Sequence, residues 1–309
     1  MISLIIVTYN SAHCLPALFA SLVATQYLNY EIIVVDNASH DASVEIARHF
    51  VPHAQIIVND HNLGFGRACN RGAAAAQGEW LLFMNPDVFV TPEWLDKLLA
   101  CAAAAPDAAL ISPETFPFNQ ASTPAIPGLL HQEKHNKAQT IAAAVTHFSN
   151  ISREHPSIDE RAALPGCALM MRRTAWDQIG GFDEHIFLYW EDTELCWRAW
   201  LLGWRVLVAH DAFVFHERGG SGGGPAWAIE AATNGLYTHL KLMRWRRVLH
   251  YMLRLVLKTM LRPGLYRAWL CNLRNLRNTL ATRRRILAQR AIDPARLEAM
   301  IDVHRKQQS

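Results

Sequence analysis

The chain has 309 residues, 51% of them hydrophobic and 18% charged, so it can bury one large core or a domain with an appendage. No uncharged apolar stretch reaches the ~18 residues of a membrane-spanning helix, and the scattered cysteines include no C-x-x-C pair, which argues against a zinc site or a disulfide framework. The net charge of +3 is modest, but its distribution along the chain is uneven.

The first part of the chain alternates between strand and helix patterns. Ile2–Val7 is a β-branched run that predicts a buried strand, and Leu15–Val23 has apolar residues at helical spacing. Glu31–Val35 repeats the strand pattern, ends at Asp36 and precedes a second helix, and Ile56–Val58 predicts a third strand. Alternating units of this length predict an α/β fold whose sheet is largely parallel and covered on both faces. The first residues lack a basic segment and a cleavage site, so we expect no signal peptide.

A further buried strand is predicted at Leu81–Met84, and it ends abruptly at Asn85-Pro86-Asp87. In an open α/β sheet the ligand crevice lies beyond the carboxyl ends of the strands, so Asn85 and Asp87 are placed to meet a ligand. Their oxygens suit a divalent cation that holds a diphosphate. The alternative is an ordinary turn after a strand, because Asn-Pro-Asp is also good turn chemistry.

A dinucleotide-binding dehydrogenase is the first alternative interpretation of this alternating strand and helix pattern. No G-x-G-x-x-G follows the first strand, where Thr8, Tyr9 and Asn10 stand instead, and there is no Walker lysine. The segment Gly64–Gly72 resembles a glycine-rich phosphate loop only superficially, because it precedes the polar strand end by a whole helix. A nucleotide could still bind through the ends of the strands.

The middle of the chain, from Thr115 to Leu164, is polar, irregular and rich in proline, and we interpret it as a variable insertion. Its four histidines lack the close spacing of zinc ligands, so they are expected to be solvated loop residues. Later in the chain, Gly219–Pro225 predicts a loop that either closes over a ligand or links two domains.

Two adjacent carboxylates, Glu191 and Asp192, follow the apolar run Ile186–Trp190 and begin a segment with helical spacing. Acids at a helix start can simply complement the helix dipole. Partial burial behind aromatic side chains would also raise a carboxylate pKa toward the working pH, which suits a general base. Glu194 is expected to orient the helix or an acceptor.

The carboxyl-terminal region is strongly basic, because no acid occurs between Glu230 and Asp293. Apolar residues there recur at helical spacing, opposite a face with cations such as Arg254 and Lys258, and predict two amphipathic helices separated by Pro263-Gly264. Basic faces with tryptophans suit an anionic membrane surface. Packing on the catalytic domain and nucleic-acid binding are the alternatives, and we expect no nucleic-acid partner because no reading motif is recognisable.

Taken together, the motifs from Met1 to about Ser221 resemble the family 2 glycosyltransferases, and most closely the rhamnosyltransferase-type members. The resemblance rests on Ile2–Asn10, Val34–Ser39, Asn62–Gly66, Phe83–Asp87, Pro165–Arg173, Gly180–Glu184, Tyr189–Arg198 and His216. It implies the GT-A fold, a Rossmann-like, mostly parallel mixed sheet flanked by helices. The catalytic domain would span residues 1–225, with residues 115–164 as a variable insertion on the acceptor side, and residues 226–309 would form a basic, amphipathic helical extension.

The resemblance also implies roles for individual residues. Asp192 would be the catalytic base with Glu191 beside it, Asp87 would bind the metal, and His216 would complete the metal or diphosphate site. Asn85 occupies the first position of the family's D-x-D, where a ribose hydroxyl would tolerate an amide. The implied substrate-binding residues are Thr8, Tyr9, Asn10, Asp36, Arg67, Asn85 and Trp190.

The implied reaction is a single displacement that inverts the anomeric carbon of a nucleotide sugar, assisted by Mg²⁺ or Mn²⁺. The resemblance favours rhamnose from dTDP-rhamnose as the donor sugar and a lipid-linked saccharide, such as an O-antigen precursor, as the acceptor. The enzyme would then be cytoplasmic and peripheral on the inner face of the membrane. A non-catalytic module that binds a sugar nucleotide or the membrane surface is the alternative function.

Overall fold

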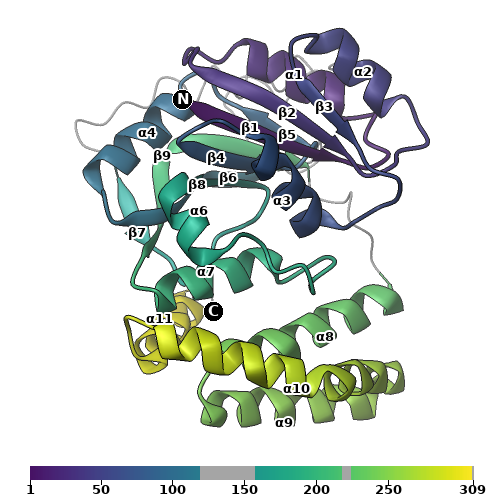
Figure 1. Cartoon of the computed structure of the whole chain (residues 1–309), viewed down its shortest axis with the longest axis vertical. Helices are drawn as coiled ribbons and strands as arrows, with labels where there is room; N and C mark the ends of the chain where they lie inside the picture. The colour runs from purple at the N-terminus through teal and green to yellow at the C-terminus, as the bar shows by residue number, and fades with distance from the viewer. Residues whose placement is uncertain (119–156, 218–223, 308–309) are drawn as a thin grey trace, which may run out of the picture.

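The computed structural model describes residues 1–118, 157–217 and 224–307, which form one central sheet with helices around it (Figure 1). The described strands are β1 (Ile2–Thr8), β2 (Tyr30–Asp36), β3 (Gln55–Val58), β4 (Trp80–Met84), β5 (Val88–Val90), β6 (Ala108–Phe118), β7 (Ile158–Glu160), β8 (Ala168–Arg172) and β9 (Arg205–Glu217). The strand order is β3-β2-β1-β4-β8-β6-β9-β5, with β7 paired to β9.

The sheet is mixed, and its two halves differ. β3, β2, β1 and β4 are parallel neighbours, as the alternating strand and helix patterns predict. β8 runs antiparallel to both β4 and β6, and β5 and β7 run antiparallel to β9, whereas β6 and β9 are parallel. The carboxyl ends of the parallel strands therefore lie at one edge, and β8 starts at this same edge.

Helices cover both faces of the sheet (Figure 1). The described helices are α1 (Leu15–Val23), α2 (Ser43–Phe50), α3 (Phe65–Ala75), α4 (Trp94–Ala104), α6 (Arg173–Ile179), α7 (Glu191–Leu201), α8 (Pro225–Leu242), α9 (Trp245–Leu261), the 3₁₀ turn η1 (Pro263–Leu265), α10 (Tyr266–Gln289) and α11 (Pro294–Gln307). Buried residues of α1, α2 and α4 form the core on one face, and those of α3, α6 and α7 form the core on the other. Strand β1 shows why both cores exist: Leu4 and Ile6 face one of them, while Ile5 and Val7 face the other.

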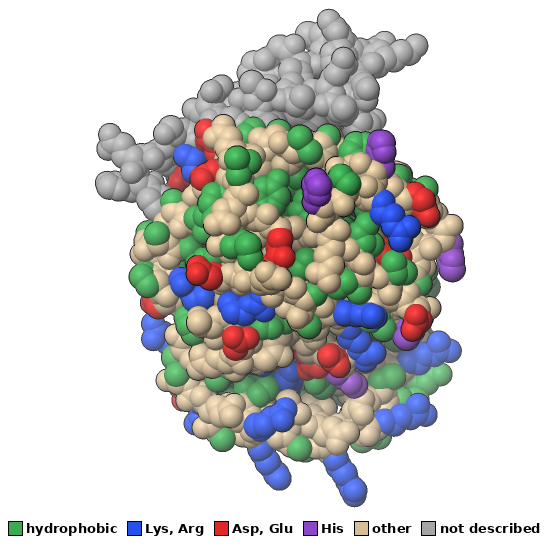
Figure 2. Space-filling view, turned by 45° about the horizontal axis from the view of Figure 1, so that its top comes forward, with side chains coloured by type: hydrophobic (Ala, Val, Ile, Leu, Met, Phe, Trp, Pro, Cys, Tyr) green, Lys and Arg blue, Asp and Glu red, His purple; other side chains and the backbone are tan. Residues whose placement is uncertain are grey.

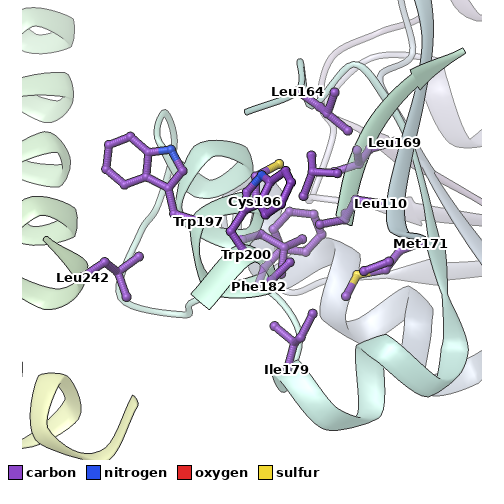
Figure 3. Packing of buried hydrophobic residues seen from close by; sticks show 14 of the residues in the cluster. Leu110, Leu164, Leu169, Met171, Ile179, Phe182, Cys196, Trp197, Trp200 and Leu242 are labelled. Carbon is purple, nitrogen blue, oxygen red and sulfur yellow. The ribbon is translucent and has the colours of Figure 1, made fainter. Parts of the chain in front are cut away.

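Helix α7 lies between the sheet and the carboxyl-terminal helices. Figure 3 shows Cys196 and Trp200 on the side of Leu110 and Leu169, while Trp197 extends toward Leu242 of α8. The core that contains α7 also includes buried residues of α8, α9, α10 and α11. Apolar burial is thus continuous from the sheet into the carboxyl-terminal helices, so these helices share the fold's core.

Buried charges also join α8 to α7. Lys241, only 3% exposed, forms ion pairs with Asp183 and Glu194, the latter at 2.5 Å. Glu194 pairs at the same time with Arg198, whose guanidinium also donates to the carbonyls of Ile179 and Gly181. Every charge in this network has an opposite charge beside it, which is the condition for burying them.

One sequence expectation needs correction here, and two others can be located along the chain. The insertion was expected from Thr115, but β6 continues to Phe118 and β7 occupies Ile158–Glu160; residues 119–156, with the four histidines, lie outside the described part of the chain. The two predicted amphipathic helices correspond to α9 and α10, and α8 and α11 accompany them. Most of the glycine-rich loop, residues 218–223, also lies outside the described part, and Pro225 begins α8.

The basic region is less uniform than its composition indicates. Arg244 and Arg247 pair with Glu298 and Asp302 of α11, and buried Arg283 donates to the carbonyls of Leu240 and Met243. Other Lys and Arg side chains project from the lower part of the molecule in Figure 2, where the carboxyl-terminal helices lie. None of the described helices combines the length and the apolar character that crossing a membrane requires.

Part of the predicted apolar stripe of α9 is exposed to solvent. Val248 and Leu255 are buried, but Met260 is 75% exposed and Leu261 85%. The exposed apolar side chains of this helix are Trp245, Leu249, Leu253, Val256, Leu257, Met260 and Leu261. Packing against the protein therefore accounts for only one side of the stripe.

Candidate active site

Three polar side chains meet between β4 and β5. Asn85 directly follows β4 and Asp87 directly precedes β5. Because β5 pairs antiparallel with β9 and Val88 lies opposite His216, the His216 Nε2 comes to 3.2 Å from the Asp87 Oδ1. The Asn85 Nδ2 lies 3.4 Å from the same imidazole nitrogen. Strand register thus joins residues that are far apart in the sequence.

These side chains fit a divalent cation that is shared with a diphosphate. The Asp87 Oδ1 is buried and accepts no hydrogen bond in the described structure, so a lone pair is available beside the His216 imidazole. Carboxylate, amide oxygen and imidazole are suitable ligands for Mn²⁺, and the oxygens suit Mg²⁺. No group of three or more His, Cys, Asp or Glu side chains among the described residues forms a complete metal site. Oxygens of a bound diphosphate would therefore have to supply further ligands.

A second group of predicted residues lies at the ends of β1 and β2. Thr8 lies opposite Asp36 in the parallel register, and its Oγ1 donates to the Asp36 Oδ1 at 2.8 Å. The Asp36 carboxylate also accepts from the backbone N–H and the hydroxyl of Ser39, whose Oγ accepts from the Asn10 N–H. Asp36 is fully buried and anchors this loop, whereas Tyr9 is 47% exposed. The loop thus presents an aromatic ring to solvent at the edge where a nucleobase is expected.

Arg67 and two glycines lie at the start of α3. The Arg67 side chain is exposed, and its Nε donates to the Glu184 carbonyl at 2.6 Å. A Cβ on Gly64 would lie 2.2 Å from the Phe187 carbonyl oxygen, and one on Gly66 would lie 3.1 Å from the Phe182 Cβ. The glycines therefore allow α3 to pack closely against the segment that leads to α7, which explains them without a phosphate loop.

The paired acids begin α7 after a strained turn. Tyr189 and Trp190 have φ values of 66° and 76°, a left-handed conformation that costs a non-glycine residue about 1–3 kcal/mol. Asn234 of α8 stabilises this turn, because its Nδ2 donates to the Leu188 and Tyr189 carbonyls at 2.9 and 3.2 Å. Strain of this kind is typical of functional sites.

The turn at Gly166-Cys167, before β8, connects Asp192 to the metal-site candidates. The Gly166 N–H donates to the Asp192 Oδ2 at 3.0 Å, and the Cys167 carbonyl accepts from the Asn85 N–H at 2.9 Å. A Cβ on Gly166 would lie 3.2 Å from the Asp192 Cβ, so a small residue is needed for this approach. One short turn therefore fixes the candidate base relative to the end of β4.

Burial perturbs both acids. Burial and the neighbouring Asp192 raise the pKa of Glu191 to about 8, and the Glu191 Oε2 has no hydrogen-bond partner in the described structure. Burial also raises the pKa of Asp192, although hydrogen bonds from Thr193 and Gly166 oppose this effect by stabilising the charged form. A buried carboxylate next to a half-buried one, with unequal hydrogen bonding, is suited to holding one proton between the two.

Trp190 was predicted to bind substrate, and its ring turns toward the carboxyl-terminal helices. Its ring packs edge-on against those of Trp197, His239 and Tyr251. It also lines a cavity between α8 and α9. Sequence reasoning assigned no role to Gly166 and did not single out Lys241 among the cations of the basic carboxyl-terminal region. The motif Pro165-Gly166-Cys167 could have drawn attention to Gly166, but no pattern in the neighbouring sequence indicates that Lys241 is buried.

Comparisons with known proteins give a family and a fold. The model of the family described as "Glycosyl transferase family 2" matches residues 3–179. The N-acetylglucosaminyl-diphospho-decaprenol L-rhamnosyltransferase of Mycobacterium tuberculosis is 28% identical over 274 residues, which cover 82% of this chain and 89% of that protein.

Two solved structures are similar to this chain in fold. The mannosyltransferase PcManGT from Pyrobaculum calidifontis in complex with GDP-Man and Mn²⁺ has a TM-score of 0.57 and 17% identity, covering 97% of this chain and 85% of that one. S. aureus TarS 1-349 in complex with UDP has a TM-score of 0.56 and 18% identity, covering 80% and 68%. These likenesses establish the predicted GT-A fold.

Proposed function

The chain belongs to glycosyl transferase family 2, and from this premise we propose that it transfers a sugar from a nucleotide-activated donor to a hydroxyl group of a lipid-linked saccharide. The observation that carries the proposal is the Gly166-Cys167 turn, which holds Asp192 on one side and Asn85 on the other. A base and a diphosphate site at fixed separation are what a direct displacement at an anomeric carbon requires.

The donor would bind along the carboxyl ends of the parallel strands. Tyr9 stacks on or borders the nucleobase, while Thr8, Asn10 and Asp36 hold the loop that carries it. Asn85 binds the ribose, and the cation of Arg67 favours the phosphates. Asp36 acts mainly through its contacts with Thr8 and Ser39, because its side chain is fully buried.

Asp87 and His216 would hold Mg²⁺ or Mn²⁺ beside the diphosphate. When bound, the cation neutralises the charge that develops on the leaving diphosphate. The buried Asp87 Oδ1 supports this role: it accepts no hydrogen bond in the described structure although the His216 Nε2 lies 3.2 Å away, and leaving a buried carboxylate oxygen without one is costly. The structure of the archaeal mannosyltransferase contains Mn²⁺ together with its sugar nucleotide, which agrees with a metal in this fold.

Asp192 would accept the proton of the acceptor hydroxyl as that oxygen attacks the anomeric carbon. The Asp192 carboxylate is oriented by hydrogen bonds from the Gly166 and Thr193 N–H groups, and its raised pKa makes it a stronger base than an exposed aspartate. Attack opposite the leaving diphosphate inverts the configuration in one step, so no covalent sugar intermediate is needed.

The mycobacterial relative supplies the most specific expectation for the substrates. By its name it transfers L-rhamnose and acts on N-acetylglucosaminyl-diphospho-decaprenol. We therefore expect dTDP-rhamnose as the donor and a saccharide on a polyprenyl diphosphate as the acceptor, within the synthesis of a cell-surface polysaccharide such as an O-antigen.

Such an acceptor would be anchored in a membrane, and the enzyme would meet it at the cytoplasmic face. The exposed apolar side chains of α9 lie next to Arg254 and Lys258 in the sequence. Apolar residues beside cations favour an anionic membrane surface, where each cation contributes roughly 1 kcal/mol. Peripheral attachment of this kind would raise the encounter rate with the acceptor.

Transfer assays with defined substrates test this function. A panel of dTDP-rhamnose, UDP-N-acetylglucosamine and GDP-mannose would be incubated with Mn²⁺ and farnesyl-diphospho-N-acetylglucosamine. We expect a rhamnosylated product whose anomeric configuration, determined by NMR, is inverted relative to the donor. Retention of configuration, or no transfer from any donor that binds, would contradict the proposal.

A further inference from the structure

A second concave site lies between the carboxyl-terminal helices, apart from the strand ends that form the donor site. The cavity has a volume of about 590 Å³ and is lined by residues of α8, α9 and η1 together with Trp190 and Arg262. Arg254 and Lys258 of α9, and Arg262, the residue that directly follows α9, contribute three cations to its lining. Arg254 and Lys258 are four residues apart, so they lie on one side of α9.

The charge of these cations is not neutralised by the described part of the chain. Arg254, Lys258 and Arg262 form no ion pair with a described carboxylate, whereas Arg244 and Arg247 pair with acids of α11. The sequence contains no acid between Glu230 and Asp293 that could pair locally. Three like charges on one wall favour a multiply charged anion.

The rest of the lining is apolar. Ala228, Ala231 and Ala232 form the α8 wall, and their small side chains leave room for a ligand. Leu255, Leu261 and Leu265 form the opposite side. An inorganic anion would gain nothing from these surfaces, so the lining favours a ligand that carries both negative charge and hydrocarbon.

The cavity reaches the residue that precedes the proposed catalytic acids. Trp190 lines the cavity and directly precedes Glu191 and Asp192 in the chain. Tyr251 is also part of the lining and approaches α8 where a side chain is absent: a Cβ on Gly235 would lie 2.1 Å from the Tyr251 hydroxyl oxygen and 3.0 Å from the Trp190 ring. A ligand here would thus contact the turn that leads directly into the two acids.

From these observations we infer that the cavity binds the diphosphate and the adjoining isoprenoid carbons of the lipid-linked acceptor. The inference rests on the proposed function, because that function supplies the polyprenyl diphosphate. Arg254, Lys258 and Arg262 bind the phosphate oxygens, and the alanine and leucine walls contact the hydrocarbon. The exposed Leu257 and Met260 of α9 continue the apolar surface toward the membrane, and the sugar extends toward Asp192.

Direct binding to the full chain tests the site without relying on turnover. The probe is farnesyl diphosphate, titrated calorimetrically into the parent protein and into R254Q/K258Q/R262Q. The matched control, R246Q/R284Q/R285Q, removes three exposed cations of α9 and α10 that do not line the cavity. We expect the cavity variant to bind about 30-fold more weakly or worse, and the control to bind within about twofold of the parent.

A second variant separates binding in the cavity from general charge. Ala231→Phe fills the cavity without changing any charge, and it should weaken farnesyl diphosphate binding while thermal unfolding and dTDP binding with Mn²⁺ stay as in the parent. Inorganic diphosphate should bind far more weakly than farnesyl diphosphate. Equal affinity for the two probes, or parent-like affinity in both the charge variant and A231F, would overturn the inference.

Vesicles distinguish the acceptor from bulk lipid as the source of the diphosphate chemistry. If both triple variants lose flotation on phosphatidylglycerol vesicles equally while farnesyl diphosphate binding is unchanged, the cations serve the membrane surface and the inference is wrong. If no donor supports transfer but farnesyl diphosphate binding is lost only in the cavity variants, the proposed function fails and the diphosphate site stands.

Discussion

Glu191 and Asp192 are adjacent carboxylates in a buried site, and charging both is costly. Asp192 accepts hydrogen bonds from Gly166 and Thr193, whereas the Glu191 Oε2 has no partner in the described structure. Near neutral pH the negative charge therefore rests on Asp192 and the proton on Glu191. This division supports Asp192 as the base and explains why the second acid does not compete for the role.

Glu191→Gln should stabilise the protein at high pH. The folded pKa of about 8 exceeds the ordinary value of 4.5, so the folded state binds more protons than the unfolded state between these values, and stability falls as pH rises through them. The variant should be more stable than the parent by on the order of 2 kcal/mol near pH 9 and equal to it near pH 4. Urea unfolding measures both, with Glu45→Gln, an exposed acid, as the control. Equal stability of variant and parent at both pH values would refute the burial of a protonated Glu191.

Donor binding should require a divalent cation through Asp87. Without one, the diphosphate and the Asp87 carboxylate repel each other. We expect Asp87→Ala to weaken dTDP binding in Mn²⁺ by about 100-fold and His216→Ala by about tenfold, because the imidazole shares its side of the site with the Asn85 amide. Calorimetry with Mn²⁺ and with EDTA gives both comparisons. Undiminished affinity of the parent protein in EDTA would count against the metal site.

At the level of elements, the buried charges fix α8 against α7. Burial alone would raise the pKa of Asp183, but the ion pair with Lys241 lowers it to about 2. The aspartate therefore stays charged beside its partner. Lys241→Met removes the cation and leaves Asp183 without an ion-pair partner among the described residues. The expected loss is about 3–5 kcal/mol in the free energy of unfolding.

Urea unfolding of Lys241→Met should be compared with Arg246→Met, which changes an exposed cation near the start of α9 and should cost less than about 0.5 kcal/mol. Equal, small losses in both variants would show that the buried network contributes little to stability. A large loss in Lys241→Met alone would support the coupling of the two helices.

The sequence predicts most elements of the catalytic half because each element carries its own periodic pattern. Leu15–Val23, for instance, is a helix with the predicted bounds, and the Asn85–Asp87 segment follows a buried strand. Local patterns do not report pairing between distant segments. Lys241 has the sequence environment of a surface cation, and its partners Asp183 and Glu194 lie much earlier in the chain. The acids that pair with Arg244 and Arg247 come from α11, which the sequence analysis did not predict.

The candidate site was predictable in its residue types and only partly in its contacts. The proximity of Asp87 and His216 follows from the pairing of β5 with β9, which no local pattern encodes. The burial of Asp36 by Thr8 and Ser39 likewise depends on the register of β1 and β2. The sequence motif places Trp190 next to the paired acids, but the direction of its ring depends on contacts with α8 and α9.

On the scale of the whole molecule, the exposed side of α9 predicts reversible membrane attachment. The full chain should float with anionic vesicles at low salt, because the cations attract the surface and the exposed leucines add apolar burial. Truncation at residue 225 is a poor test, since buried residues of α8 and α9 belong to the core that contains α7. L253S/L257S/L261S, which changes three exposed side chains, should reduce flotation and leave thermal unfolding unchanged.

Salt and lipid composition provide the controls for this flotation. Neutral vesicles, or anionic vesicles at high salt, should retain little protein, because screening removes the electrostatic part of the attraction. Flotation that is equal with neutral vesicles at high salt would exclude electrostatic attachment. Absence of flotation with anionic vesicles at low salt would leave α9 as a packed extension of the fold.

The account as a whole depends on Asp192 being the base of a glycosyl transfer, and Asp192→Asn tests this most directly. The amide keeps the shape of the side chain and leaves Asp87 and His216 untouched. We predict that the variant binds dTDP-rhamnose with Mn²⁺ as the parent does, by calorimetry, while its transfer to farnesyl-diphospho-N-acetylglucosamine falls by about 10²–10⁴-fold. Parent-like turnover by the folded variant would contradict the assignment of Asp192 as the base.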